Sequence, residues 1–327
     1  MVTRRRVMIA LAASALVPPA AFAQQPPKVW RVGFLNFPPL QAQREAYDRF
    51  VDGLRELGYV EGKNLVMEMR AADGINERLS GLAEELVRLK VDVILCNSGT
   101  AFAAQKATST IPIVFANTFD PVGLGLVASL ARPGGNITGI SNALEATSGK
   151  NLEYLRAVVP KLARVAVLTG APATRASNVF MESMQPAAKA AGINISLFRA
   201  TTPAEIVLAF GAMARARSGA LIVVPGPFLT VQARQITELA AKNRLPAMYT
   251  LGIFVDAGGL LSYGPTRAEM YHQAARQVDK ILKGAKPADI PVEQPTEFEL
   301  VINMKTARAL GIKFPKSILV QAVRVIE

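Results

Sequence analysis

The stretch IPIVFANTFDPVGLGLVASLARPGGNITG, residues 111–139, decides the fold. It opens with β-branched and aromatic residues that predict a short buried strand over residues 111–115. Asn117 follows, and the Asp-Pro pair that begins at Asp120 suits the N-cap and first position of a helix, which we expect over residues 121–130. Polar side chains and a helix start would then lie at the carboxyl end of a parallel strand, where open α/β sheets bind ligands.

The same alternation of strand and helix continues on both sides of this stretch. It predicts an α/β fold with two doubly wound parallel-sheet lobes of similar size. In the first half we expect strands at 30–35, 65–70 and 91–95 and helices at 41–57, 77–89 and 99–108. In the second half we expect strands at 165–169, 193–199, 220–224, 247–249, 258–263 and 298–304, and helices at 143–158, 176–191, 203–216, 231–242 and 266–282.

The first 23 residues have the three parts of an export signal. Three arginines precede an apolar run that is too short for a stable membrane span, and Ala-Phe-Ala ends at Ala23. We expect a signal peptide over residues 1–23, with a membrane anchor as the alternative and with the Sec or twin-arginine route left open. The residue directly after the cleavage site is not a cysteine, so a lipoprotein is not expected.

Charge and cysteine content narrow the function classes. Removing the signal takes away three arginines, so the net charge falls from +12 to about +9. No basic run with interleaved aromatics remains, and we expect no nucleic-acid partner. Cys96 is the only cysteine and fits a buried strand end, with a thiol near the ligand as the alternative. The sequence has none of the usual hydrolase, metal or nucleotide motifs, so we expect no cofactor, no metal and no catalytic residues.

Two polar clusters follow predicted strands in the first half. The run Asn97, Ser98, Gly99 and Thr100 precedes a helix, where its amides and hydroxyls would meet a carboxylate or phosphate, or would simply cap the helix. The second cluster consists of Asn117, Thr118 and Asp120, of which Asn117 and Asp120 are candidate ligand residues. Asp120 would either bind a ligand ammonium or cap its own helix.

Aromatic residues follow strands in the second half. Phe228 comes after the Pro-Gly-Pro run and Tyr249 ends a short strand. Each would supply apolar contact to a ligand, or would pack in the core of its lobe.

Six phrases resemble the ABC-transporter substrate-binding family that includes tryptophan- and other aromatic amino-acid-binding members, with a type I periplasmic binding protein fold. They are GLRELGYVEGKNL (53–65), LAEELVRLKVDVIL (82–95), ATSTIPIVFA (107–116), DPVGLGLVASLARPGGNITG (120–139), AGGLLSYGP (257–265) and the run from VDKILKGAKP to INMKTARALG (278–311). The resemblance implies that the ligand lies between two lobes, that residues 97–100 face it, and that Asn36 and Asp120 lie nearby. Ala101 departs from the Thr-Pro or Ser-Gly-Thr-Pro of many family members, so ligand identity does not carry over.

The resemblance also predicts the organisation of the chain. The first lobe would hold residues 28–140 and about 264–296, and the second residues 141–262 and about 297–327, joined by a multi-strand hinge. We expect a monomeric periplasmic protein that captures an amino acid or other small carboxylate and delivers it to the permease subunits of an ABC importer. The alternatives are a periplasmic sensing module for a membrane receptor and an exported α/β enzyme.

Overall fold

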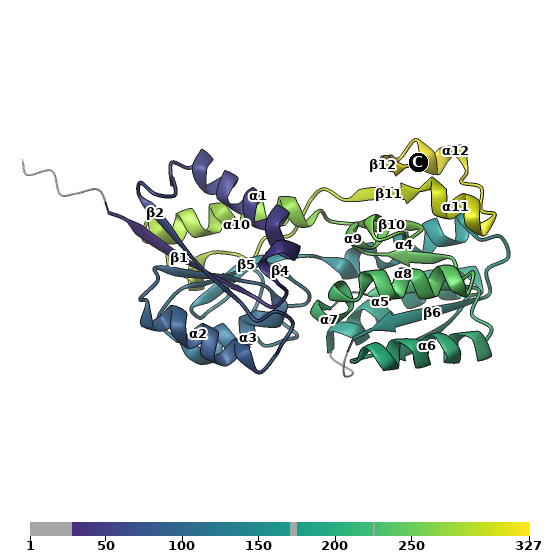
Figure 1. Ribbon diagram of the computed structural model, residues 1–327, viewed down its shortest axis with the longest axis horizontal. Coiled ribbons are helices and arrows are strands. Elements are labelled where there is room, and N and C mark those ends of the chain that lie inside the picture. Colours follow the sequence, from purple (N-terminus) through teal and green to yellow (C-terminus); the bar gives the residue numbers. More distant parts are fainter. Residues whose placement is uncertain (1–27, 171–174, 225) are drawn as a thin grey trace, which may run out of the picture.

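The computed structural model describes residues 28–170, 175–224 and 226–327, so the predicted signal peptide lies outside the described residues. Two sheets lie side by side along the long axis of the molecule (Figure 1). The first has five strands in the order β2-β1-β3-β4-β5, and the second has seven in the order β12-β11-β10-β9-β8-β6-β7. The predicted class, two α/β lobes built on parallel sheets, is confirmed.

The first sheet is parallel throughout. The sheet is doubly wound: a helix lies in each connection from β1 through to β4, whereas β4 and β5 are joined by a segment of turns without a helix. The strands are β1 (Trp30–Asn36), β2 (Leu65–Ala71), β3 (Val93–Cys96), β4 (Ile113–Thr118) and β5 (Ile137–Ser141).

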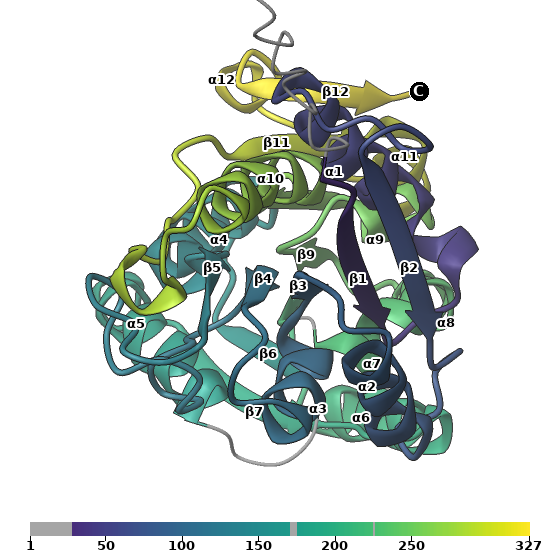
Figure 2. The same cartoon turned by 90° about the vertical axis from the view of Figure 1, so that its left-hand side faces the viewer.

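Helices cover both faces of this sheet. Figure 2 shows α1 and α10 on one face and α2 and α3 on the other. Each face has its own apolar cluster, one around Phe34 and Phe50 and the other around Phe115 and Ile94. The helices are η1 (Leu40–Gln43), α1 (Arg44–Glu56), α2 (Arg78–Arg88), α3 (Ser98–Ala107) and α10 (Arg267–Leu282).

The second sheet is parallel except where β10 meets β11. Two apolar clusters, one around Phe180 and Leu155 and one around Phe254 and Phe210, fill its two faces. The strands are β6 (Arg164–Thr169), β7 (Asn194–Arg199), β8 (Ala220–Val224), β9 (Ala247–Tyr249), β10 (Leu261–Gly264), β11 (Glu299–Asn303) and β12 (Ala322–Ile326). The helices are α4 (Leu144–Val158), α5 (Arg175–Ala191), α6 (Pro203–Arg215), α7 (Pro227–Val231), α8 (Ala233–Lys242), α9 (Ile253–Asp256), α11 (Met304–Leu310) and α12 (Lys316–Leu319). The short helix η2 (Pro287–Asp289) lies against β5 of the first sheet.

The chain passes between the two sheets after β5, after β10 and in the segment before β11. After β5 it enters α4, which packs on the second sheet, and after β10 it enters α10, which packs on the first. Glu293 still bridges to Ile140 of β5, and β11 then returns to the second sheet. Figure 1 shows the yellow return segment running between the two halves.

The predicted helix over residues 121–130 is wrong. Asp120 takes a left-handed conformation with φ 39°, and Gly125 takes φ 72°. The amides of Leu126 and Val127 both donate to the carbonyl of Pro121, at 3.0 and 3.3 Å, which closes a compact turn. Two glycines in this short segment lower its helix propensity, and a positive φ ends any helix.

Strand β5 was not predicted from the sequence. The run Gly134-Gly135-Asn136, which is typical of a turn, leads directly into β5, which is parallel to β4. Gly139 weakens the strand pattern of ITGIS, yet this glycine is required: a Cβ there would lie 2.0 Å from the carbonyl oxygen of Phe115.

Candidate ligand-binding site

Unpartnered polar atoms lie at the carboxyl edge of the first sheet. Asn36 ends β1 and has no exposed surface. Within the described ranges, neither its Oδ1 nor its Nδ2 has a hydrogen-bond partner, and the same holds for the buried Oγ1 of Thr118 at the end of β4. A buried polar group without a partner costs about 1–3 kcal/mol. Each such group needs an explanation, and one explanation is a ligand that supplies the missing hydrogen-bond partner.

The corner between β4 and β5 adds two asparagines to this edge. The backbone N–H of Asn142 donates to the carbonyl of Thr118 at 2.9 Å, and its Nδ2 donates to Oδ1 of Asn117 at 2.8 Å. These bonds join the ends of neighbouring strands at the first crossing. Among the residues that the structure describes, the buried Oδ1 of Asn142 has no donor, so it is a further acceptor at this edge.

Asp120 has one carboxylate oxygen bonded and one unpartnered. Its Oδ1 accepts the N–H of Gly123 at 2.8 Å, which is the capping role predicted from the sequence, although it caps a turn and not a helix. Its Oδ2 is buried and, in the described part of the chain, has no hydrogen-bond donor. A buried carboxylate oxygen needs a donor or a cation to offset its lost hydration. The cap therefore uses one oxygen of the side chain, and the other oxygen is available to a donor.

The predicted anion site at residues 97–100 is largely closed by its own hydrogen bonds. The Asn97 side chain accepts the N–H of Gly99 at 3.1 Å, and its carbonyl accepts the N–H of Thr100 at 3.0 Å. The Thr100 hydroxyl is buried, accepts the Asn97 N–H at 3.1 Å and donates to the carbonyl of Leu35 at 3.0 Å. These contacts form a capping box, and the side chain of Ser98 lies outside the described residues.

Cys96 ends β3 directly before this helix start. It is fully buried, and that burial raises the pKa of its thiol. A neutral thiol in an apolar cluster matches the core residue predicted from the sequence.

The aromatic residues predicted for the second lobe are packing residues in this structure. Tyr249 has no exposed surface and stacks on Phe254 with ring centroids 4.9 Å apart, and its buried hydroxyl has no hydrogen-bond partner among the described residues. Phe228 is half-buried and packs against the same apolar cluster. Thr250 follows β9 with a fully buried hydroxyl that lacks a partner among the described residues, so it is the second lobe's counterpart of Thr118.

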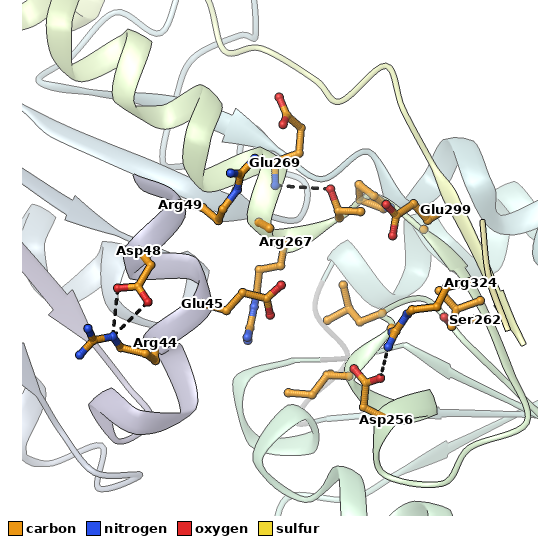
Figure 3. A pocket seen from close by; sticks show the side chains of 18 of the residues that line it. Arg44, Glu45, Asp48, Arg49, Asp256, Ser262, Arg267, Glu269, Glu299 and Arg324 are labelled. Carbon is orange, nitrogen blue, oxygen red and sulfur yellow. Dashed lines mark hydrogen bonds and ion pairs between the residues drawn. The ribbon is translucent and has the colours of Figure 1, made fainter. Parts of the chain in front are cut away.

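Away from the sheet edge, a polar pocket lies between the lobes. Figure 3 shows a pocket of about 910 Å³ between the start of α1 and the strands β10, β11 and β12. Its charges pair mostly on their own side: Arg44 with Asp48 at 3.0 Å, and Arg324 with Asp256 at 2.6 Å. About half of each side chain in the Arg324 pair is exposed, so the pair contributes little energy.

The described residues contain neither a cluster of metal-binding side chains nor a membrane-spanning helix. No group of three His, Cys, Asp or Glu side chains there is arranged to hold a metal ion. In the same residues, no helix has the length and apolar character needed to cross a membrane.

The sequence matches the family model described as ABC transporter substrate binding protein over residues 32–326. The chain belongs to this family. The description of this family names substrate binding as its role.

Relatives of this substrate-binding protein are known from sequence and structure. The Tyrosine-binding protein of Clostridioides difficile is 28% identical over 266 residues, which cover 81% of this chain and 76% of that protein. A Vibrio cholerae conserved domain protein has a TM-score of 0.83 and 28% identity, covering 91% of this chain and all of that one. A Streptococcus pneumoniae ABC domain, solved in complex with L-Trp, has a TM-score of 0.83 and 26% identity over the same shares.

Two of the unpartnered residues, Asn142 and Thr250, were not predicted from the sequence, and Thr118 was placed in the second polar cluster without being named as a ligand residue. Thr118, Asn142 and Thr250 each follow or end a strand, which is the same signal that drew attention to Asn97 and Asp120. Asn142 was not recognised as a candidate because β5, the strand before it, was not predicted.

Proposed function

We propose that this substrate-binding protein captures an amino acid between its two lobes in the periplasm and delivers it to the permease subunits of an ABC importer. The observation that carries the proposal is the set of buried, unpartnered polar atoms at the carboxyl edge of the first sheet. An amino acid brings both an ammonium group and a carboxylate, and this edge offers a carboxylate oxygen, two amides and a hydroxyl. The tyrosine-binding and L-Trp-bound relatives support the same class of ligand.

Asp120 is the residue proposed to bind the ligand ammonium. Its Oδ2 is buried beside the end of β4, and a hydrogen bond to a charged donor there contributes about 1.5–3 kcal/mol. The capping bond of Oδ1 fixes the carboxylate before the ligand arrives, which lowers the entropy lost on binding.

Asn36 is proposed to bind the ligand carboxylate through Nδ2, with the helix start at residues 97–100 beside it. The capping box holds that helix start rigid, and the Thr100 hydroxyl links it to the carbonyl next to Asn36. In this proposal Asn97 and Thr100 position the site, while Asn36 and Asp120 contact the ligand.

Closure of the lobes would complete the site. The chain crosses between the sheets at the ends of β5 and β10 and again before β11, and such hinges let two rigid lobes rotate toward one another. Thr250, at the carboxyl end of β9, is the described residue of the second lobe best placed to contribute a hydroxyl. The predicted signal peptide supports a periplasmic location for this monomeric receptor.

A thermal-shift screen of the protein against the twenty amino acids and a set of small carboxylates tests the proposal. A ligand present at 100 times its dissociation constant stabilises the folded state by about 2.7 kcal/mol, which corresponds to about 5–10 °C for lobes of this size. We expect L-tyrosine or L-tryptophan to give a shift of this order. A shift with carboxylates that lack an ammonium group, and none with any amino acid, would contradict the proposal.

A further inference from the structure

Phe119 is a residue of the first lobe that packs on the core of the second. It follows β4 directly, between Thr118 and Asp120. Its half-buried side chain packs against an apolar cluster whose members, such as Leu152 and Leu300, all lie in the second lobe. An apolar side chain that leaves its own lobe in this way makes the position of its backbone depend on both lobes.

The backbone on either side of Phe119 is held in place. Thr118 pairs with Ser141 in the sheet, and its carbonyl accepts the N–H of Asn142 at 2.9 Å. Asp120 has a left-handed φ of 39°, and its Oδ1 is bonded to the N–H of Gly123. Phe119 lies between these two fixed points, so its contact with the second lobe bears on the peptide that leads into Asp120.

We propose that Phe119 is a positioning residue that ties the ligand-binding carboxylate of Asp120 to the second lobe. Through this contact the position of the Asp120 backbone, and with it Oδ2, depends on the second lobe, while the bond to Gly123 fixes the carboxylate within its own turn. This inference rests on the proposed function, because it assigns Asp120 to the ligand ammonium.

Titration calorimetry with L-tyrosine and L-tryptophan tests the assignment, with the deaminated analogues 3-(4-hydroxyphenyl)propionate and indole-3-propionate as matched probes. Phe119→Ala should weaken binding of the amino acid by about tenfold, which is the size of a 1.4 kcal/mol effect. The same variant should change the affinity for the deaminated analogue by less than about twofold, because that analogue has no ammonium for Asp120.

A double-mutant cycle with Asp120→Asn decides whether Phe119 acts through Asp120. If it does, the variant with both changes binds the amino acid no more weakly than Asp120→Asn alone. Phe119→Leu should restore most of the affinity. Phe198→Ala, which removes a partly buried ring that packs within the second lobe alone, should lower the melting temperature without changing affinity.

Three results would overturn the assignment. Equal affinities of Phe119→Ala and wild type, equal losses for the amino acid and its deaminated analogue, or additive losses in the cycle would each show that Phe119 does not position Asp120, and the proposed function would stand. Failure of the wild-type protein to bind either amino acid would count against the proposed function and remove the assignment with it.

Discussion

The hydroxyl of Thr100 donates to the carbonyl oxygen of Leu35 at 3.0 Å and so joins the start of α3 to the end of β1. The same hydroxyl accepts the N–H of Asn97 at 3.1 Å. The Thr100 hydroxyl, which was predicted from the sequence to meet the ligand, therefore bonds to the protein itself. Its contribution is to hold the start of α3 to the end of β1.

Thr100→Ala should destabilise the first lobe. The variant loses a helix cap, worth about 1 kcal/mol, and leaves the buried Leu35 carbonyl without this donor, so we expect a loss of about 1–3 kcal/mol in urea unfolding. Thr100→Ser keeps the hydroxyl and should recover most of the loss. A large fall in ligand affinity with unchanged stability would instead place Thr100 in contact with the ligand.

Asn36→Leu should separate stability from binding. Leucine has a similar size and removes two buried polar atoms that lack partners, so the ligand-free protein should gain about 1 kcal/mol while amino-acid affinity falls at least tenfold. Calorimetric melting and titration measure the two effects. Asn136→Leu is the control, because its amide donates to the carbonyls of Thr108 and Ile111 and its loss should lower stability. A less stable Asn36→Leu protein would count against the unpartnered state of Asn36.

Asp120→Asn should weaken amino-acid binding by about 10- to 100-fold, the worth of a charge-assisted hydrogen bond. Asparagine tolerates the left-handed conformation and can still accept the N–H of Gly123, so the fold should be unaffected. Asp73→Asn is the matched control for Asp120→Asn, because Asp73 also has a positive φ but pairs with Arg78 at the surface. Affinities of the two variants, measured by calorimetry, should differ clearly, and equal affinities would exclude Asp120 from the site.

Gly139→Ala should prevent folding or cost several kcal/mol. A Cβ at this position would lie 2.0 Å from the Phe115 carbonyl oxygen, so β4 and β5 would have to separate. Gly135→Ala is the control four residues earlier, where a Cβ would meet nothing within 4 Å, and it should change stability by less than about 0.5 kcal/mol. Denaturant melts of the two variants give the comparison, and a stable Gly139→Ala protein would show that the strands can move apart.

Tyr59→Phe should alter stability at high pH. Burial, helped by the bond that its hydroxyl donates to Asp279 at 2.9 Å, raises the pKa of Tyr59 to about 12. The unfolded chain loses this proton near pH 10, so the stabilisation is complete below pH 10 and is lost as the pH rises through about 12. The difference in unfolding free energy between wild type and Tyr59→Phe, measured from pH 8 to 12, should shrink over that window. A constant difference would contradict the raised pKa.

The sequence was a good guide to the elements and a partial guide to the site. Buried β-branched runs and helix caps such as Thr266 before α10 are local signals, and they predicted most strands and helices. Local signals failed where the conformation depends on distant contacts, as in β5, whose Gly139 is dictated by Phe115. The helix predicted after Asp120 failed because its propensity is weak and a left-handed residue begins the segment.

From the sequence alone followed the α/β class, the position of polar residues at strand ends, and Asp120 and Asn36 as candidates. The tertiary structure decided which polar atoms are already bonded and which remain unpartnered. Thr100 and Asn97 complete a capping box and the Tyr249 ring packs in a core, whereas Asn36, Thr118 and Asn142 keep atoms without partners among the described residues. The reason is physical: a hydrogen bond needs a partner within about 3 Å, and that partner often lies far away in the sequence, as Leu35 does from Thr100.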